Sequence, residues 1–191
     1  MVDEFKAEIL TEDISFLCSK WILDRTPHIF SDDRNAYIKW KEELAKRLAL
    51  DSKSIIFTGS SSVGFSLNPS KNFKLFDNDS DIDIAIISDF HFDLSWKFLR
   101  NMGTKRFDLT HKQKAFIQDH VNRLIYWGTI ATDKILQILP FGKEWEIILL
   151  DMSKLDPING KEINIRIYKD FESLRQYQIN NLRNIYYNSY Q

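Results

Sequence analysis

The chain is poor in cysteine, proline and glycine. Its 191 residues include one cysteine, four prolines and six glycines. A single cysteine, Cys18, excludes an internal disulfide and any zinc site built on several thiolates. No Pro/Gly/Ser-rich linker, low-complexity tract or internal repeat divides the chain, so the simplest partition is a single domain over residues 1–191.

Long apolar runs and an excess of charge of one sign are also missing. No apolar stretch approaches the length that spans a bilayer, and the first residues, MVDEFKAEIL, lack an apolar signal core. We therefore expect a cytoplasmic protein with no membrane partner. The net charge of −1 gives no general attraction to nucleic acid, so any site for a polyanion has to be a local patch.

Several common catalytic motifs are absent from the sequence. It contains no H-E-x-x-H, no serine elbow, no Cys–His arrangement and no Gly-Lys-Ser/Thr of a Walker loop. The four histidines show no paired spacing. Hydrolase and zinc-enzyme interpretations therefore have no support.

The most informative stretch is 54–88, SIIFTGSSSVGFSLNPSKNFKLFDNDSDIDIAIIS. Its apolar runs, 54–58 and 81–87, are predicted strands. Successive side chains of a strand alternate between faces, so Asp81 and Asp83 share one face and the isoleucines lie on the other. Two such close carboxylates repel each other unless they share a hard cation. Mg²⁺ typically takes one or two protein carboxylates together with waters and phosphates.

The turn after the first strand is suited to phosphate. Gly59 lets the backbone approach a ligand, and Ser60 adds a hydroxyl donor. Ser61 opens a predicted short helix over 61–67, whose free N–H groups favour anions. The turn and the two aspartates together therefore predict a site for a metal-bound triphosphate.

The remaining pattern is that of an α/β protein. Residues 143–155 fit a helix, with a buried strand over 146–150 as the alternative. The basic cluster Lys105, Arg106, Lys112 and Lys114 is more typical of a solvated loop and helix start than of a phosphate contact. Alternation over 162–168 predicts a strand with its isoleucines inward and four polar residues outward, Glu162, Asn164, Arg166 and Tyr168. Helical spacing predicts further helices at 8–24, 34–50, 92–102, 111–126, 129–139 and 171–188.

The order G-S, insert, S-D-I-D-I resembles the signature of the DNA polymerase β-like nucleotidyltransferase superfamily. The longer run T-G-S-S-S-V-G-F-S-L-N-P…S-D-I-D-I-A-I-I is most similar to the small stand-alone bacterial type. The resemblance covers residues 59–87, under a fifth of the chain. It implies an α/β (α+β) fold, in which a small mixed sheet is flanked by helices and extra helices lie at both ends of the chain.

The resemblance also implies an activity. Such an enzyme uses Mg²⁺ or Mn²⁺ to transfer a nucleoside monophosphate, with ATP as the expected donor, to a hydroxyl of a protein, an RNA or a nucleotide. Asp81 and Asp83 match the metal-binding catalytic carboxylates, and Gly59 and Ser60 match the pair that binds the β- and γ-phosphates. Small relatives often act with a partner protein in toxin–antitoxin or antiphage modules.

The third carboxylate of the family pattern is the open point. Glu162 at the start of the later strand and Glu146 are the candidates, and Arg166 is a candidate phosphate contact. The alternative function is a catalytically weak nucleotide-binding subunit, regulatory or sensory, with the same fold. A cyclic-oligonucleotide synthase would need an added helical domain, for which 191 residues leave little room.

Overall fold

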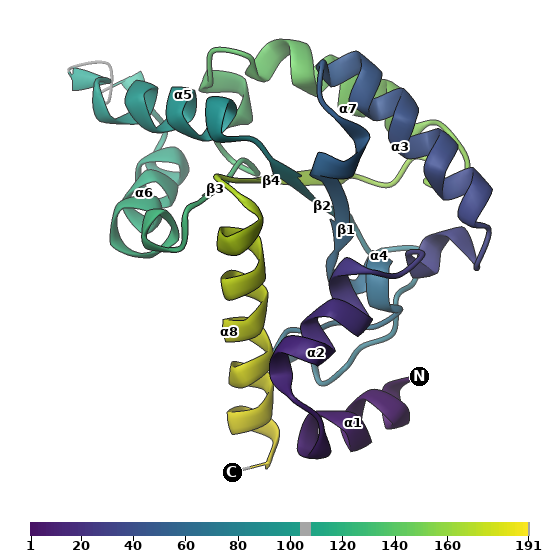
Figure 1. The fold of residues 1–191 in the computed structure, drawn as a ribbon. Coiled ribbons are helices and arrows are strands. Elements are labelled where there is room, and N and C mark those ends of the chain that lie inside the picture. Colours follow the sequence, from purple (N-terminus) through teal and green to yellow (C-terminus); the bar gives the residue numbers. More distant parts are fainter. Residues whose placement is uncertain (104–107, 191) are drawn as a thin grey trace.

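A four-stranded mixed sheet forms the centre of the protein, seen in a computed structural model that describes residues 1–103 and 108–190 (Figure 1). Across the sheet the strands follow in the order β1 (Ile55–Thr58), β2 (Ile82–Ile87), β4 (Ile163–Tyr168) and β3 (Thr129–Ala131). β2 and β4 are parallel, whereas β1 and β3 each run antiparallel to their neighbour. The predicted α/β class with a small mixed sheet is therefore confirmed.

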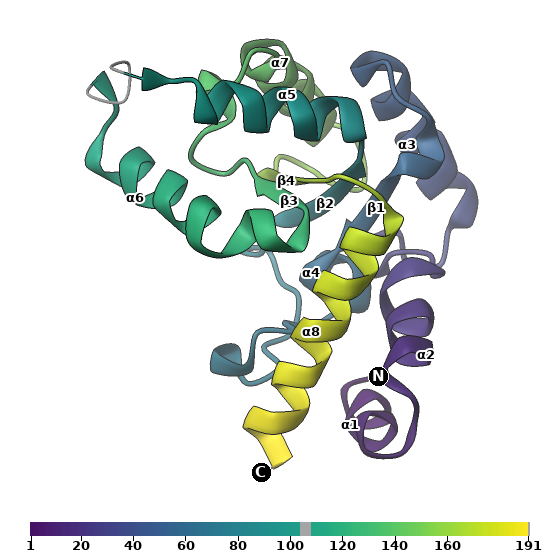
Figure 2. The same ribbon diagram turned by 60° about the vertical axis from the view of Figure 1, so that its left-hand side comes forward.

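Helices cover the sheet on both sides (Figures 1 and 2). In the described part of the chain the α-helices are α1 (Val2–Thr11), α2 (Ile14–Cys18), α3 (Arg34–Leu48), α4 (Gly59–Val63), α5 (Asp89–Arg100), α6 (His111–Asp119), α7 (Gly142–Ser153) and α8 (Phe171–Tyr190). α3 and α7 lie over one face of the sheet. The first half of α8 packs on the other face, against β4 and β2.

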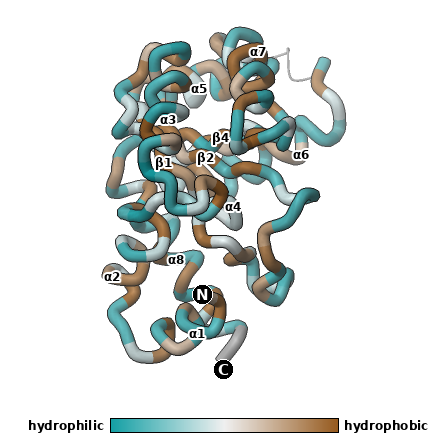
Figure 3. The backbone as a smooth tube through the Cα atoms, turned by 90° about the vertical axis from the view of Figure 1, so that its right-hand side faces the viewer, coloured by the Kyte–Doolittle hydropathy of each residue, from teal (hydrophilic) through white to brown (hydrophobic). Residues whose placement is uncertain are grey.

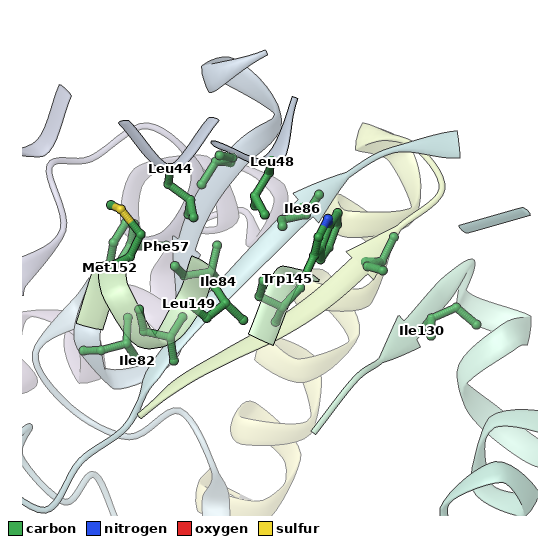
Figure 4. Close-up of a cluster of buried hydrophobic side chains, with 14 of the residues drawn as sticks. Leu44, Leu48, Phe57, Ile82, Ile84, Ile86, Ile130, Trp145, Leu149 and Met152 are labelled. Carbon is green, nitrogen blue, oxygen red and sulfur yellow. The ribbon is translucent and has the colours of Figure 1, made fainter. Parts of the chain in front are cut away.

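The α3/α7 face holds the main hydrophobic core (Figure 4). Ile82, Ile84 and Ile86 of β2 alternate onto this face, where they meet leucines of α3 and Trp145 and Met152 of α7. The same alternation brings the three isoleucines of β4 inward. In Figure 3 the hydrophobic colour follows β2 and β4. The period-two pattern of the sequence therefore decides which face is polar.

The polar face of the sheet turns toward α8. A small cluster of Ala85, Tyr168 and Leu174 joins β2, β4 and the first turns of α8. Beyond the sheet, α8 packs on α1 and α2 through a second cluster (Figure 1), which includes Phe5, Leu17, Leu182 and Ile185. Tyr168 lies on the predicted outward face, yet it is buried because α8 covers it.

Most predicted elements are present. The strands at 54–58, 81–87 and 162–168 and the helices at 34–50 and 171–188 are confirmed within a few residues, and the stretch 143–155 is helical, as α7. The segment predicted as a helix over 8–24 is broken, because the Asp13 side chain accepts hydrogen bonds from the N–H groups of Ser15 and Phe16 and starts α2. The short helix predicted at 61–67 begins earlier, at Gly59.

The prediction of a helix over 129–139 is wrong. Thr129–Ala131 forms β3, which pairs with β4, and only Leu136–Ile138 makes a 3₁₀ turn. Pairing with a strand more than thirty residues away overrides the local helical spacing. Lys105 and Arg106 of the basic cluster lie outside the described residues. No helix in the described ranges has both the length and the apolar character to cross a membrane.

His120 connects β3 to the helical segment before it through side-chain hydrogen bonds. The side chain is fully buried, with Nδ1 2.7 Å from the Phe116 carbonyl oxygen. Nε2 accepts a hydrogen bond of 3.0 Å from the N–H of Ala131. Burial lowers the pKa of His120, so the imidazole is neutral at physiological pH.

We expect His120→Leu to lower the free energy of unfolding by about 2–4 kcal/mol, because it leaves the buried N–H of Ala131 without a partner. Chemical denaturation near neutral pH measures this. His111→Leu, at an exposed position of α6, is the matched control and should change stability by less than about 0.5 kcal/mol. Equal effects of the two changes would contradict the anchoring role of His120.

Candidate functional site

The strand register brings the predicted site residues into one row. Thr58 at the end of β1 pairs with Asp83 of β2, and Asp83 pairs with Asn164 of β4. All three side chains belong to the face of the sheet opposite the main core. The turn that follows Thr58 therefore begins directly beside the two aspartates.

Gly59 packs against the Asp83 carboxylate. Its backbone has a φ of +59°, which side-chain-bearing residues rarely adopt. A Cβ atom built on Gly59 would collide with Oδ2 of Asp83. Glycine is thus required here both by the backbone conformation and by the nearness of the carboxylate.

Asp81 lies just before β2 and is exposed. Its Oδ2 accepts a hydrogen bond of 2.8 Å from Nδ2 of Asn164. Asn164 therefore lies beside both aspartates, as strand neighbour of Asp83 and hydrogen-bond partner of Asp81. On the resemblance described above, a third carboxylate is expected on the strand beside the two aspartates, and Asn164 occupies that place.

The row opens into a cavity of about 680 Å³ between the polar face of the sheet and α8. Gly59, Ser60, Asp81, Asp83 and Arg166 all line it. Other walls come from the loop after α4 and from α8, through Ser66, Leu67, Asn68, Pro69, Lys71, Tyr177, Gln178, Asn181 and Asn184. Five of the predicted site residues thus meet in one space.

Asp83 is the electrostatic centre of this cavity. Its pKa is raised to about 6, chiefly because burial disfavours the charged carboxylate and next because Asp81 repels it. The charge of Asp133 raises the pKa further, whereas Arg166 and Lys71 lower it. Two carboxylates and two cations therefore act on the Asp83 carboxylate.

Arg166 is held against α8. Its Nη1 donates a hydrogen bond to the hydroxyl of Tyr177, and the guanidinium carbon lies 4.9 Å from the centre of that ring. The arginine reaches no carboxylate within ion-pair distance in the described residues. Its charge is therefore available to an anion in the cavity.

Ser61 and the two candidate third ligands lie elsewhere. The Ser61 hydroxyl is buried and donates to the carbonyl oxygen of Thr58, so it supports the turn and does not line the cavity. Glu162 and Glu146 line an adjoining cavity of about 550 Å³ between β4 and α7. Glu146 also accepts a hydrogen bond from Gln137. Neither glutamate lines the cavity of the aspartates.

Asp133 is the acidic residue that the sequence analysis missed. It follows β3 by two residues and lines both cavities, as do Asn164 and Ile165. The sequence feature that could have indicated it is an aspartate two residues after the short stretch 129–131. It was hidden because that stretch was predicted to be helical.

The oxygen atoms of the site suit a hard divalent cation whose remaining ligands are waters or phosphate oxygens. Within the described ranges no group of three or more His, Cys, Asp or Glu side chains is arranged to hold a metal. Asp81 and Asp83 supply two carboxylates, and their mutual repulsion is a cost that a divalent cation would offset. Mg²⁺ completes such a pair with waters and phosphate oxygens.

We expect Asp83→Asn to stabilise the protein by about 1–2 kcal/mol at about pH 7.5 in the presence of a chelator. The folded state must keep a charged carboxylate whose pKa is about 6, above its unfolded value. As the pH falls through about 6, the folded protein takes up the proton first, which stabilises the wild type. Thermal unfolding should therefore show the full gain at about pH 7.5 and a clearly smaller one at about pH 4.5.

Asp79→Asn, at an exposed position in the loop before β2, is the control and should change stability little at either pH. A melting temperature of Asp83→Asn below that of the wild type at neutral pH would contradict the electrostatic cost assigned to Asp83.

Comparisons of the chain with protein-family models, with curated proteins and with solved structures find no match. A functional assignment therefore has to be argued from the residues and the geometry of the site.

Proposed function

We propose that the protein is a Mg²⁺-dependent nucleotidyltransferase that moves a nucleoside monophosphate from a nucleoside triphosphate, ATP in the first place, to a hydroxyl group. The observation that carries the proposal is the meeting of the Gly59–Ser60 turn with Asp81 and Asp83 in one cavity, beside the unpaired cation of Arg166. A turn that admits a phosphate and two repelling carboxylates are the complementary halves of a metal–triphosphate site.

The chain's own groups have separate roles in this reaction. Ser60 and the backbone after Gly59 bind the terminal phosphates, and Lys71 and Arg166 offset their negative charge. Asp81 and Asp83 hold the cation. When bound, Mg²⁺ neutralises charge on the phosphates and lowers the pKa of the acceptor hydroxyl. The acceptor hydroxyl loses its proton to solvent, its oxygen attacks the α-phosphorus, and pyrophosphate leaves with the electrons of the broken P–O bond.

Asp133 is the best-placed acid to act on the acceptor. Its charge is felt by Asp83, and it lies where the two cavities adjoin. An acceptor that enters through the second cavity would meet Asp133 and Asn164 before it reaches the nucleotide. Much of the rate acceleration in phosphoryl transfer comes from such positioning and from charge stabilisation.

One observation favours a second function, that of a nucleotide-binding subunit without transferase activity. The strand position next to Asp83 holds Asn164, a neutral amide, where the family pattern calls for a carboxylate. Such a protein would bind Mg²⁺–ATP, and a partner protein would respond to whether the nucleotide is bound. Asp133 distinguishes the two proposals, because only a transferase needs it.

Incubation with labelled ATP, Mg²⁺ and a cell extract that contains protein and RNA tests transfer, and calorimetry tests binding. Asp83→Asn should abolish both, because it removes half of the cation site. Asp133→Asn should reduce transfer by about a hundredfold while ATP affinity changes by less than about threefold.

Glu146→Gln and Glu162→Gln are the matched comparisons. Both should leave ATP affinity unchanged, because the glutamates lie outside the nucleotide cavity, and should reduce transfer far less than Asp133→Asn, because they line only the second cavity. If either variant lost transfer while Asp133→Asn stayed fully active, that glutamate and not Asp133 would be the acid that acts on the acceptor. Intact Mg²⁺–ATP binding with no pyrophosphate release from any acceptor would favour the binding subunit.

A further inference from the structure

α8 presents a row of carboxamides to the nucleotide cavity. Gln178, Asn181 and Asn184 are spaced three residues apart, so they lie on one side of the helix, and all three line the cavity. At a rise of 1.5 Å per residue the row extends about 9 Å along α8. Gln178 is buried, Asn181 is half-buried and Asn184 is exposed, so the row runs from the depth of the cavity to its mouth.

The outer two carboxamides are free to bind a ligand. Gln178 interacts with the buried Tyr168 hydroxyl and accepts a long, 3.5 Å hydrogen bond from Asn181. The side chain of Asn184 has no hydrogen-bond partner in the described residues, and neither has the side-chain oxygen Oδ1 of Asn181. The row therefore offers both donors and acceptors.

The loop after α4 adds two apolar side chains to a lining that is mostly polar. Leu67 and Pro69 line the same cavity, and the 3₁₀ turn Pro69–Lys71 packs close to α8. Two apolar side chains near a row of amides suit a flat, partly polar ring, because the faces of such a ring are apolar and its edges carry donors and acceptors. Beside a triphosphate site, that ring is the nucleobase.

The charges at this end of the cavity bear on which base fits. Arg123 is engaged by Asp119 through two hydrogen bonds of 3.1 and 2.8 Å. Lys71 is the cation next to the loop wall, and its charge acts on Asp83. Arginine and lysine typically recognise guanine, whereas the donor–acceptor pair of an Asn or Gln side chain matches N6 and N7 of adenine.

We infer that Asn181 and Asn184 form a base-recognition site that selects adenine, and that the donor of the reaction is an adenine nucleotide. The inference rests on the proposed triphosphate site and adds the part of the substrate that Asp81 and Asp83 leave undefined. The phosphates bind at the sheet, and the base lies along α8 between the carboxamides and the loop.

Calorimetric titration in Mg²⁺ with ATP, GTP, CTP, UTP and inorganic tripolyphosphate distinguishes the contribution of the base to binding affinity from that of the phosphates. The wild type should bind ATP about tenfold more tightly than the other four ligands. The double variant Asn181→Ala, Asn184→Ala should lose this preference and keep its affinity for tripolyphosphate within about twofold. Alanine is the better helix former, so α8 should remain folded.

Asn180→Ala is the matched control, since Asn180 is the same residue type on the same helix and does not line the cavity. It should keep the preference for ATP. The base site would be overturned if the wild type bound all four nucleotides equally or bound GTP, CTP or UTP more tightly than ATP. It would also be overturned if the preference for ATP survived the double variant or was lost in Asn180→Ala. If the wild type binds tripolyphosphate without base preference, only this inference fails. If it does not bind tripolyphosphate at all, the proposed phosphate site fails as well.

Discussion

The close contact between Gly59 and the Asp83 carboxylate is the constraint on which the rest of the site depends. The β1–β2 register pairs Thr58 with Asp83, so the next residue must pass directly beside that carboxylate. No side chain fits there, and the backbone is left-handed. A substitution such as Gly59→Val would therefore displace Asp83 as well as obstruct a phosphate, and Asp83 itself is the cleaner position at which to probe the site.

Burial of Asp83 beside Asp81 and Asp133 is costly for the fold alone. A carboxylate whose pKa is raised by desolvation and by like charges destabilises the folded state at neutral pH. Arg166 and Lys71 offset only part of that cost, since the net shift remains upward. Clusters of this kind are concentrated at functional sites, where a ligand supplies the missing charge. The electrostatics therefore favour a cationic ligand at this point over a purely structural role for the aspartates.

The parts of the fold that local periodicity determines could be predicted from the sequence. The alternation around Asp83 and Arg166 gave the polar faces of β2 and β4, and hence most of the cavity. β3 could not be predicted, because a run of three residues is too short to show a period and acquires strand geometry only by pairing with β4. Asp133 was missed for the same reason. Ser61 was assigned to the phosphate site because the sequence does not show which serine of the turn faces inward.

The position of α8 is coupled to the two helices at the N-terminus. Its Leu182 and Ile185 pack on Phe5 of α1 and Leu17 of α2, while Asn181 faces the cavity. The cavity wall beyond the sheet thus belongs to a helix whose apolar side is covered by α1 and α2. Because α8 extends well past β4, the sheet alone cannot fix the position of its second half. Packing by α1 and α2 therefore sets the width of the cavity, and on the proposed function these helices belong to the nucleotide site as much as the strands do.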